Sequence, residues 1–440
     1  MADEWGKSRL GDLSEVITKG TTPTTLGYSF TDFGVNFVKS ESVTFDGWID
    51  PSKFAYINTE THEALKRSQL KEGDILFSMA GVYIGKTAVV PSHMLPANTN
   101  QAVGIVRLDK RRAVPRFIDY HLRNPSYNRF LNNLVAQSAQ PNLNLTEIRN
   151  LPINLPPIPE QRAIAHILGT LDDKIELNRR MNATLEAMAR TLFQSWFVVF
   201  DPVRAKLDGL KPLGLDSATA ALFPAHFQDS PLGPIPRGWE IGPILKQANL
   251  LSGGTPKTSV PDYWEGDVAW ASAKDVSQCG DAFLISTERS ITKRGLDESS
   301  TKIIPAFATV VVARGATTGR LTMFGEAMAM NQTCYGLESK FATPFALYCH
   351  ARQFIDTVVH SAHGSVFDTI TTQTFERTDL LLAPADILRA FDQRVSPLFY
   401  QIRANLHQSR TLATLRETLL PKLLSGELST AIANKLENPG

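Results

Sequence analysis

The sequence of 440 residues is poor in cysteine. It holds three, and all of them, Cys279, Cys334 and Cys349, lie in the second half. An odd and sparse set does not fit a disulfide framework, and none of the spacings is that of a zinc site. We therefore expect a reduced, cytoplasmic protein without a metal centre.

Long apolar runs and targeting segments are also lacking. No apolar run approaches the ~20 residues that a membrane-spanning helix requires. The first ten residues, MADEWGKSRL, are charged from the start, so we expect no signal peptide. The apolar content of 43% is ordinary for a globular protein, and 440 residues allow two or three domains with sizeable cores.

Charge of one sign does not dominate. The chain carries 45 Lys and Arg against 44 Asp and Glu, a formal net charge of +1. This balance argues against a protein that coats nucleic acid without selectivity, since such proteins are usually strongly basic. It leaves open a DNA reader whose basic groups are confined to one face. The local basic cluster at 110–129 is equally compatible with solvated surface charge.

Catalytic motifs are missing as well, so we expect no catalytic residue and no cofactor. The nearest to one is AGVYIGKT at 80–87, which resembles a phosphate-binding loop. Such a loop must lead into a helix, whereas TAVVP at 87–91 predicts a strand. The second half has Arg320 where Lys86 stands. A P-loop ATPase remains an alternative, which loss of nucleotide binding on Lys86→Ala would support.

What the sequence does contain is a long heptad pattern at 159–200. Apolar residues recur there at alternating steps of four and three, with two asparagines at the centre, as expected for one long helix packed on another. At 1.5 Å per residue such a helix is ~60 Å long, and it needs an equally long partner. The positions are Ile164, Leu168, Leu171, Ile175, Asn178, Asn182, Leu185, Ala189, Leu192 and Trp196.

The chain supplies this partner 227 residues later. The second copy is Phe391, Val395, Leu398, Ile402, Asn405, Ser409, Leu412, Arg416, Leu419 and Leu423. Pro397 is expected to interrupt and kink this helix, and Pro421 to disturb its last turn. With the two helices antiparallel and their midpoints together, Asn182 faces Asn405 and Asn178 faces Gln408 or Ser409. A coiled-coil scaffold without a DNA role is a second alternative.

The remainder of the chain also repeats. Short runs at 35–38, 75–79, 87–90 and 102–108 predict strands, and 115–134 predicts one or two helices. GTTP at 20–23 corresponds to GGTP at 253–256, and NQ at 100–101 to NQ at 331–332. We predict an α+β fold of two duplicated mixed α/β domains joined by two long coiled-coil helices, whose antiparallel pairing is implied by the family resemblance given below. The expected layout is 1–155 first domain, 156–200 first long helix, 201–234 linker, 235–383 second domain, 384–428 second long helix and 429–440 tail.

Polar side chains gather in the repeated loops. Side chains of these types bind base edges and phosphates, although ordinary turn polarity explains each residue equally well. The frame repeats while the loop residues differ, as two readers of two different short sequences would require. The candidate DNA-binding residues are Thr22, Lys39, Ser40, Tyr83 and Lys86 in the first half, and Lys257, Lys274, Arg314, Thr317, Thr318 and Arg320 in the second.

Five motifs resemble those of one family. They are LPPIPEQRAI at 155–164, QSWF and FDPV at 194–203, GPIPRGW at 233–239 and LLSGEL at 423–428. The family is the non-catalytic DNA-specificity subunit of type I restriction–modification systems, which defend against foreign DNA. The resemblance implies two target-recognition domains on antiparallel spacer helices and binding to double-stranded DNA. It also implies assembly with two modification subunits, which methylate adenine, and two restriction (motor-nuclease) subunits, which cleave. We expect a bipartite, asymmetric target whose unread gap the helices set.

A partner surface is expected on the first long helix. Ile167, Met181, Met188 and Phe193 are apolar but lie off the heptad seam. Gln161 and Arg162 belong to the Pro-rich helix entry, and the second entry at 383–388 lacks its Glu-Gln pair. The expected subunit-interface residues are Gln161, Arg162, Met188 and Phe193.

Overall fold

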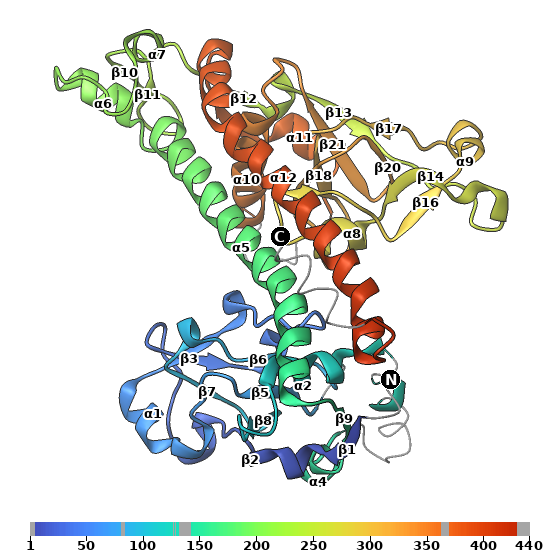
Figure 1. The fold of residues 1–440 in the computed structure, drawn as a ribbon. Helices are drawn as coiled ribbons and strands as arrows, with labels where there is room; N and C mark the ends of the chain where they lie inside the picture. The colour runs from blue at the N-terminus through green and yellow to red at the C-terminus, as the bar shows by residue number, and fades with distance from the viewer. Residues whose placement is uncertain are drawn as a thin grey trace, which may run out of the picture. The chain divides into compact units, whose positions relative to one another are not determined.

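The computed structural model describes residues 5–80, 84–125, 127, 129–131, 142–361 and 369–428. The chain separates into two compact units, which we call the first unit (1–174 with 411–440) and the second unit (175–410). Two helices of 40 residues each, α5 (Ile158–Phe197) and α12 (Ala385–Leu424), contribute to both (Figure 1). In the described part, no helix is long and apolar enough to cross a membrane.

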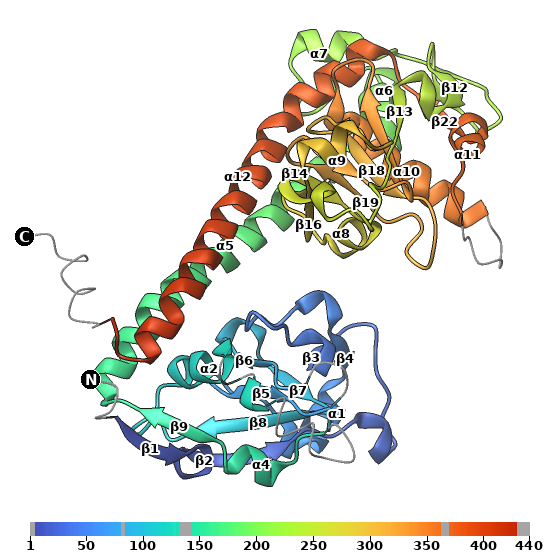
Figure 2. The same cartoon turned by 90° about the vertical axis from the view of Figure 1, so that its right-hand side faces the viewer.

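The described residues of the first unit form a four-stranded sheet, a three-stranded sheet and one two-stranded pair. The two larger sheets can be followed in Figures 1 and 2. The four-stranded sheet is antiparallel, in the order β2 (Ser14–Lys19), β8 (Val103–Leu108), β5 (Ile75–Ser78), β6 (Thr87–Val89). The other has the order β4 (Ala55–Ile57), β3 (Val35–Val38), β7 (Ala97–Thr99), and β3 runs parallel to β7. The terminal strands β1 (Gly6–Arg9) and β9 (Pro152–Leu155) pair with each other. The four predicted strands are thus confirmed to within one residue at each end.

The second unit repeats this frame. Its larger sheet has the order β13 (Ala248–Ser252), β21 (Cys334–Ser339), β18 (Thr309–Val312), β19 (Leu321–Phe324), β15 (Phe283–Leu284). Its smaller sheet has the order β16 (Arg289–Ile291), β14 (Trp264–Ala271), β20 (Met328–Met330), β17 (Ile303–Ile304), and β14 runs parallel to β20. β12 (Glu240–Pro243) pairs with β22 (Asp379–Leu382). Among the described strands of residues 239–383, only β15 and β17 have no counterpart in the described part of the first unit, so the duplication is confirmed.

Short helices cover the sheets. In the first unit these are α1 (Thr59–Ala64), α2 (Pro115–Arg123), which lies next to β6 (Figure 2), and α4 (Leu145–Arg149). In the second they are α8 (Ala273–Gln278), α9 (Lys293–Asp297), α10 (Pro344–Ser361) and α11 (Thr372–Arg377). The linker forms α6 (Asp201–Leu207), α7 (Ser217–Leu222) and the pair β10 (Phe227–Gln228) and β11 (Ile235–Pro236). The predicted helical stretch 115–134 begins as α2, and its end at 132–134 lies outside the described residues.

The long helices bury the predicted seam, because none of its positions is exposed. In the first unit Ile164 and Leu168 of α5 and Leu423 of α12 join the core of the globule. In the second, Trp196 of α5 and Phe391 of α12 do the same, with ring centroids 5.7 Å apart. Each end of the α5–α12 helix pair is therefore also part of a globular core.

The prolines do not interrupt α12, so that prediction was wrong. The helix is continuous from Ala385 to Leu424 and includes Pro397 and Pro421. A proline inside a helix removes the hydrogen bond to the carbonyl four residues earlier. For Pro397 this is the carbonyl of Gln393, an exposed residue, where water can take the place of the missing donor.

The predicted polar layer at the centre of the helix pair is confirmed within the second unit. The Nδ2 of Asn405 donates to the Oδ1 of Asn182 at 2.8 Å. The Nδ2 of Asn178 lies 2.9 Å from the Oε1 of Gln408 and 3.1 Å from the Oγ of Ser409. Asn178 is fully buried and Asn182 is 6% exposed. Because buried amides lose free energy unless they are paired, this layer disfavours a shifted register.

An ionic network joins both helices to the globule of the first unit. The carboxylate of Asp172 in α5 accepts hydrogen bonds from Arg416 of α12 at 2.6 Å, Tyr120 of α2 at 2.7 Å and Arg123 of α2 at 3.3 Å. Arg416 occupies a seam position that is Ala189 in the first copy. Asp172 explains this departure, because it gives the charge of Arg416 a partner.

Candidate DNA interface

The candidate reading loops of the first unit meet at one end of its strands. The amide of Thr21 donates to the carbonyl of Thr99 at 3.0 Å, and the hydroxyl of Thr99 donates to the carbonyl of Val38 at 2.7 Å. The amide of Met79 donates to the carbonyl of Ala102 at 2.9 Å. These bonds bring together the loops after β2, β3, β5 and β7.

The second unit builds the same edge with the same contacts. The amide of Gly254 donates to the carbonyl of Met330 at 2.9 Å, and that of Ala313 to Thr333 at 2.8 Å. A side-chain hydrogen bond, which we call the latch, also recurs. Thr22 donates to Gln101 in the first unit, and Thr255 donates to Gln332 in the second. Thr22 thus has a role in the repeated frame, and its predicted contact with DNA stays a prediction.

Lys39 and Ser40 follow β3 at this edge. The side chain of Lys39 is 34% exposed, its ammonium lies 3.8 Å from the carboxylate of Glu41 and 5.6 Å from the ring centroid of Phe30. Ser40 is half-buried, and its carbonyl accepts from the amide of Val43 at 3.3 Å. Lys39 is therefore accessible to a phosphate. The predicted contact Tyr83 lies outside the described residues.

Lys86 does not have the position expected for a direct DNA contact. It is 7% exposed, and its ammonium donates to the carbonyl of Val43 at 3.0 Å. Burial lowers the pKa of Lys86, and the nearby charge of Lys53 lowers it further. The chain continues from Lys86 into the strand β6 and not into a helix. The phosphate-loop alternative therefore lacks the helix that it requires.

The second unit presents an exposed basic loop between β18 and β19. Arg314, Thr317 and Arg320 are exposed there, as is Lys257 in the loop after β13. In the described part of the chain, neither Arg314 nor Arg320 takes part in an ion pair. The loop is a defined turn, since the amide of Thr318 donates to Gly315 at 3.0 Å and the amide of Arg320 to Thr317 at 3.1 Å. Two guanidinium groups on a defined turn can form bidentate contacts with bases or phosphates.

Two other candidates of the second unit are engaged in local contacts. Lys274 forms an ion pair with Glu288 at 2.6 Å, and this hydrogen bond raises the pKa of Lys274. The hydroxyl of Thr318 donates to the carbonyl of Gly315 at 2.7 Å. Of the predicted contacts in the second unit, Thr318 is half-buried, Lys274 is exposed but ion-paired, and Arg314, Arg320, Thr317 and Lys257 are exposed.

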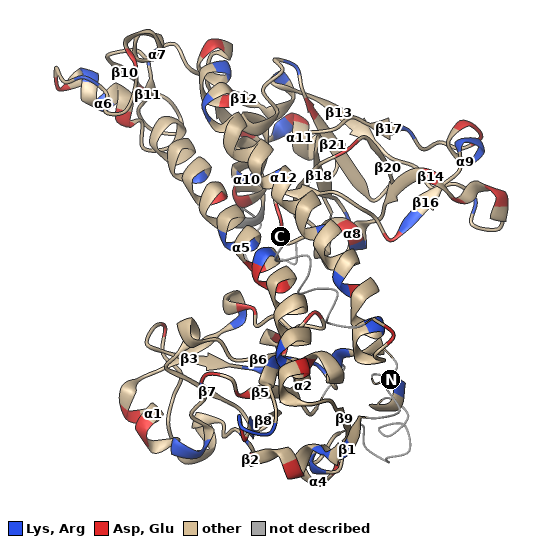
Figure 3. Ribbon diagram, viewed as in Figure 1, with Lys and Arg blue, Asp and Glu red and all other residues tan. Residues whose placement is uncertain are grey.

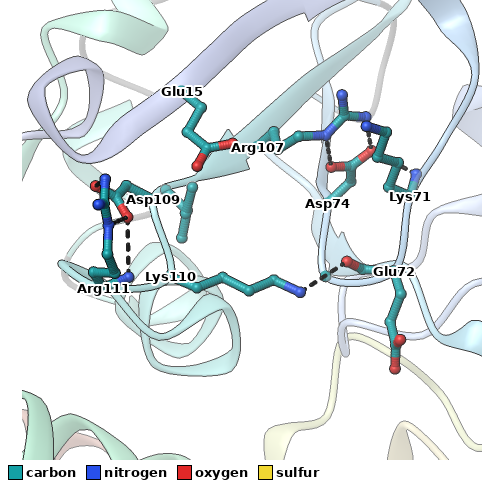
Figure 4. Close-up of a pocket in the computed structure, with 10 residues that line it drawn as sticks. Glu15, Lys71, Glu72, Asp74, Arg107, Asp109, Lys110 and Arg111 are labelled. Carbon is teal, nitrogen blue, oxygen red and sulfur yellow. Dashed lines mark hydrogen bonds and ion pairs between the residues drawn. The ribbon is translucent and has the colours of Figure 1, made fainter.

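Charges over both units are mixed in sign (Figure 3). In one pocket, charges of opposite sign pair with each other (Figure 4). It encloses about 320 Å³ and is lined by four basic and four acidic residues, Lys71, Arg107, Lys110, Arg111, Glu15, Glu72, Asp74 and Asp109. Arg107 makes two bonds of 2.7 Å to Asp74, and Arg111 pairs with Asp109 at 3.0 Å. Since Arg107 and Arg111 already have carboxylate partners, this pocket is a poor site for a phosphate group.

The expected partner surface on α5 is corrected at two positions. Phe193 is 6% exposed and packs edge-on against Phe391 and His350 in the core of the second unit. Gln161 is 1% exposed, accepts from the amide of Val114 at 2.9 Å and donates to the carbonyl of Pro156 at 2.9 Å. Both therefore stabilise the fold. Met188, 52% exposed, and Arg162, also exposed, remain available to a partner.

One accessible side chain that was not predicted from the sequence lies at the reading edge, by which we mean the end of the strands where the candidate reading loops meet. Phe45 is 64% exposed, and its ring centroid lies 5.0 Å from the ammonium of Lys86. The available sequence signal was the Asp46-Gly47 pair between Val43 and Ile49, because Asp-Gly between apolar residues predicts a hairpin turn.

Comparisons with known proteins agree with this architecture. The sequence model of the type I restriction modification DNA specificity domain matches residues 2–187 and 236–395. The type I restriction enzyme HindI specificity subunit of Haemophilus influenzae is 24% identical over 97% of this chain and 100% of its own length. The MjaIX specificity subunit of Methanocaldococcus jannaschii is 24% identical over 97% of this chain and 94% of its own.

A solved structure shares the fold. The S subunit of a type I restriction-modification system from M. genitalium aligns with a TM-score of 0.57 at 13% identity, over 96% of both chains. The two matched segments coincide with the two halves of the duplication. The relatives are named specificity subunits, which are not the catalytic subunits of these enzymes. The chain therefore belongs to the family of type I restriction–modification DNA specificity subunits.

Proposed function

We propose that this chain reads a bipartite, asymmetric DNA target, one half with each unit, and directs adenine methylation by modification subunits and cleavage by restriction subunits. One observation carries the proposal, namely that the same strand frame occurs twice with different side chains on its reading loops. The latch Thr22–Gln101 recurs as Thr255–Gln332, whereas Lys39 is replaced by Ser272. A constant frame with variable loops suits two readers of different sequences.

The proposed layout has target-recognition domains at 1–155 and 235–383, with spacer helices at 156–200 and 384–428. The gap between the half-sites is then set by how α5 and α12 pair. The asparagine layer supports a fixed gap, because a shift by one heptad moves one helix by ~10 Å along the other. Half-sites one DNA turn apart are ~34 Å from each other, so such a shift would be read as a different spacing.

The partners in this proposal are double-stranded DNA, two modification subunits and two restriction subunits. Exposed apolar side chains on the helices support a protein partner there. Leu177 and Met188 of α5 are 45% and 52% exposed, and Tyr400 and Leu415 of α12 are 51% and 44% exposed. Arg162 at the exposed start of α5 adds a charged contact.

The test is to sequence the methylated positions in a host that carries this chain with its modification subunits. A two-part adenine-methylated motif with a gap of constant length is expected. A single contiguous motif would contradict the bipartite assignment, and absence of sequence selectivity would favour a scaffold. A host with the modification subunits but without this chain is the control.

A further inference from the structure

The reading edge of the first unit carries an exposed aromatic side chain on a preorganised turn. The backbone folds back between Val43 and Ile49, which form an antiparallel bridge. Phe45 lies within this turn and is 64% exposed. A single exposed phenylalanine is not unusual in itself, and what distinguishes Phe45 is its fixed turn and its place beside the candidate DNA-binding residues Lys39 and Lys86.

Several contacts hold the turn in one conformation. The amide of Thr44 donates to the carbonyl of Trp48 at 2.9 Å, and the amide of Trp48 donates to the Oγ1 of Thr44 at 3.0 Å. The guanidinium of Arg123 donates to the carbonyl of Asp46 at 2.6 Å. Gly47 has a φ of 79°, and a Cβ there would lie 2.5 Å from the guanidinium carbon of Arg123.

This arginine is itself fixed. Its side chain is 8% exposed and pairs with Asp119 at 2.8 Å and with Asp172 of α5 at 3.3 Å. The turn is therefore anchored to the globule and to a spacer helix. A side chain that is rigid before binding loses less conformational entropy when it binds.

Basic side chains lie near the ring, together with carboxylates, since Lys39 pairs with Glu41 and Lys53 pairs with Asp50 at 3.4 Å. The ammonium of Lys86 lies 5.0 Å from the centroid of Phe45 and is bonded to the carbonyl of Val43. The charges of Lys53 and Glu41 act on Lys86, and Glu41 in turn lies 3.8 Å from Lys39. The side chains of Lys39 and Lys53 are 34% and 50% exposed. Exposed aromatic and basic groups side by side are typical of nucleic-acid contacts.

The described part of the second unit shows no equivalent aromatic turn. The sheet registers match Val38 with Ala271, because β3 pairs with β7 as β14 pairs with β20. After Ala271 the chain enters α8 and not an aromatic turn. Among the described residues 239–383, Ile303 is the only large hydrophobic side chain that is exposed. Within the described residues, an exposed aromatic side chain at the reading loops is therefore found in the first unit and not in the second.

We propose that Phe45 is an apolar wedge that enters one base-pair step of the half-site read by the first unit and partly unstacks it. The inference rests on the proposed DNA-reading function. Lys86 is then a positioning residue, which supports the turn and the ring. Pyrimidine–purine steps unstack most easily, so the first unit recognises such a step in part by its deformability. The second unit relies on polar contacts from Arg314 and Arg320.

The test uses the full chain assembled with its modification subunits and a duplex that carries the methylated motif. 2-Aminopurine, whose fluorescence rises when it is unstacked, is placed at each step of the first half-site in turn. Wild type is expected to raise fluorescence at one step. Phe45→Ala should abolish the rise and weaken binding roughly 5- to 150-fold, the range for losing one base–aromatic contact. Phe45→Leu, which keeps an apolar wedge, should retain most of both.

Phe33→Ala is the matched control. Phe33 is 83% exposed but precedes β3, at the opposite end of that strand from Lys39. It should behave as wild type. Unchanged fluorescence and binding within twofold for Phe45→Ala would overturn the wedge, as would an equal loss with Phe33→Ala. A wild-type complex that does not prefer its motif over a scrambled duplex would instead overturn the proposed function, and the wedge with it.

Discussion

Removal of Asp172 should destabilise the first unit more than removal of any exposed ion pair. Its carboxylate accepts from three donors on two helices, Arg416, Tyr120 and Arg123. Asp172→Ala leaves Arg416, whose side chain is 10% exposed, with Glu417 alone at 3.7 Å. Breaking a buried ion pair by removing one partner costs about 3–5 kcal/mol. Since the side chain of Asp172 is itself 24% exposed, we expect about 2–4 kcal/mol.

A compensating variant separates charge burial from packing. Asp172→Leu with Arg416→Ala replaces the pair by apolar residues and restores at position 416 the alanine of the first seam copy. Replacing a buried pair by apolar residues is often neutral, so most of the stability should return. Part of the loss should remain, because Tyr120 and Arg123 no longer have the carboxylate.

The assay is urea unfolding followed by far-ultraviolet circular dichroism, with the transition of the first unit compared between variants. Arg111→Ala is the control, because the side chain of Arg111 is 88% exposed in its pair with Asp109 and should contribute less than about 1 kcal/mol. A loss below about 1 kcal/mol for Asp172→Ala would refute the reasoning. So would a double variant that is no better than the single one.

Three further outcomes are expected. The double variant Asn178→Leu with Asn182→Leu should have an unchanged or raised melting temperature. Methylome sequencing should nevertheless show motifs with gaps of more than one length, because leucine does not disfavour a shifted helix register as the buried amides do. A single gap length would contradict this. Arg314→Ala or Arg320→Ala should relax one position in one half-site by ~1–3 kcal/mol if the contact is to a base, and relaxation in both halves would contradict the one-unit, one-half assignment. Burial raises the pKa of Asp392 from 3.8 to about 6, so its contribution to stability is present below about pH 4 and lost as the pH rises through 6. Asp392→Asn keeps an oxygen that accepts from the amides of Phe345 and Ala346 but carries no charge. Relative to wild type, its free energy of unfolding in urea should therefore be higher at pH 7.5 than at pH 4 by up to about 3 kcal/mol. An equal difference at both pH values would contradict the assignment.

The features predicted correctly from the sequence are those that depend on periodicity. The seam positions follow from the heptad pattern, and the pairing of Asn182 with Asn405 follows from aligning the two midpoints in the antiparallel orientation that the family resemblance implies. The strands follow from short apolar runs between turn residues. These features need no knowledge of which distant residues meet.

The predictions that failed depend on contacts between residues that are distant in the sequence. The ammonium of Lys86 is buried where it donates a hydrogen bond to the carbonyl of Val43, and Phe193 is buried because Phe391 and His350 lie against it. Those neighbours are 43 residues away for Lys86, and on α10 and α12 for Phe193. No local pattern around a lysine or an off-seam phenylalanine reports such contacts. For Phe45 the local Asp46-Gly47 signal predicts the turn, but the exposure of the ring depends on which distant residues lie beside it.

The central layer of the helix pair resembles the interface of a symmetric dimer within one chain. Asn178 and Asn182 of the first copy correspond to Asn405 and Ser409 of the second, so the contacts Asn182–Asn405 and Asn178–Ser409 are related by a local two-fold exchange. In a true homodimer a substitution appears on both sides of such an interface. Here one asparagine has become Ser409, and the Oδ1 of Asn178 is left without a hydrogen-bond partner. Duplication within a single chain thus lets each copy of a symmetric contact change alone.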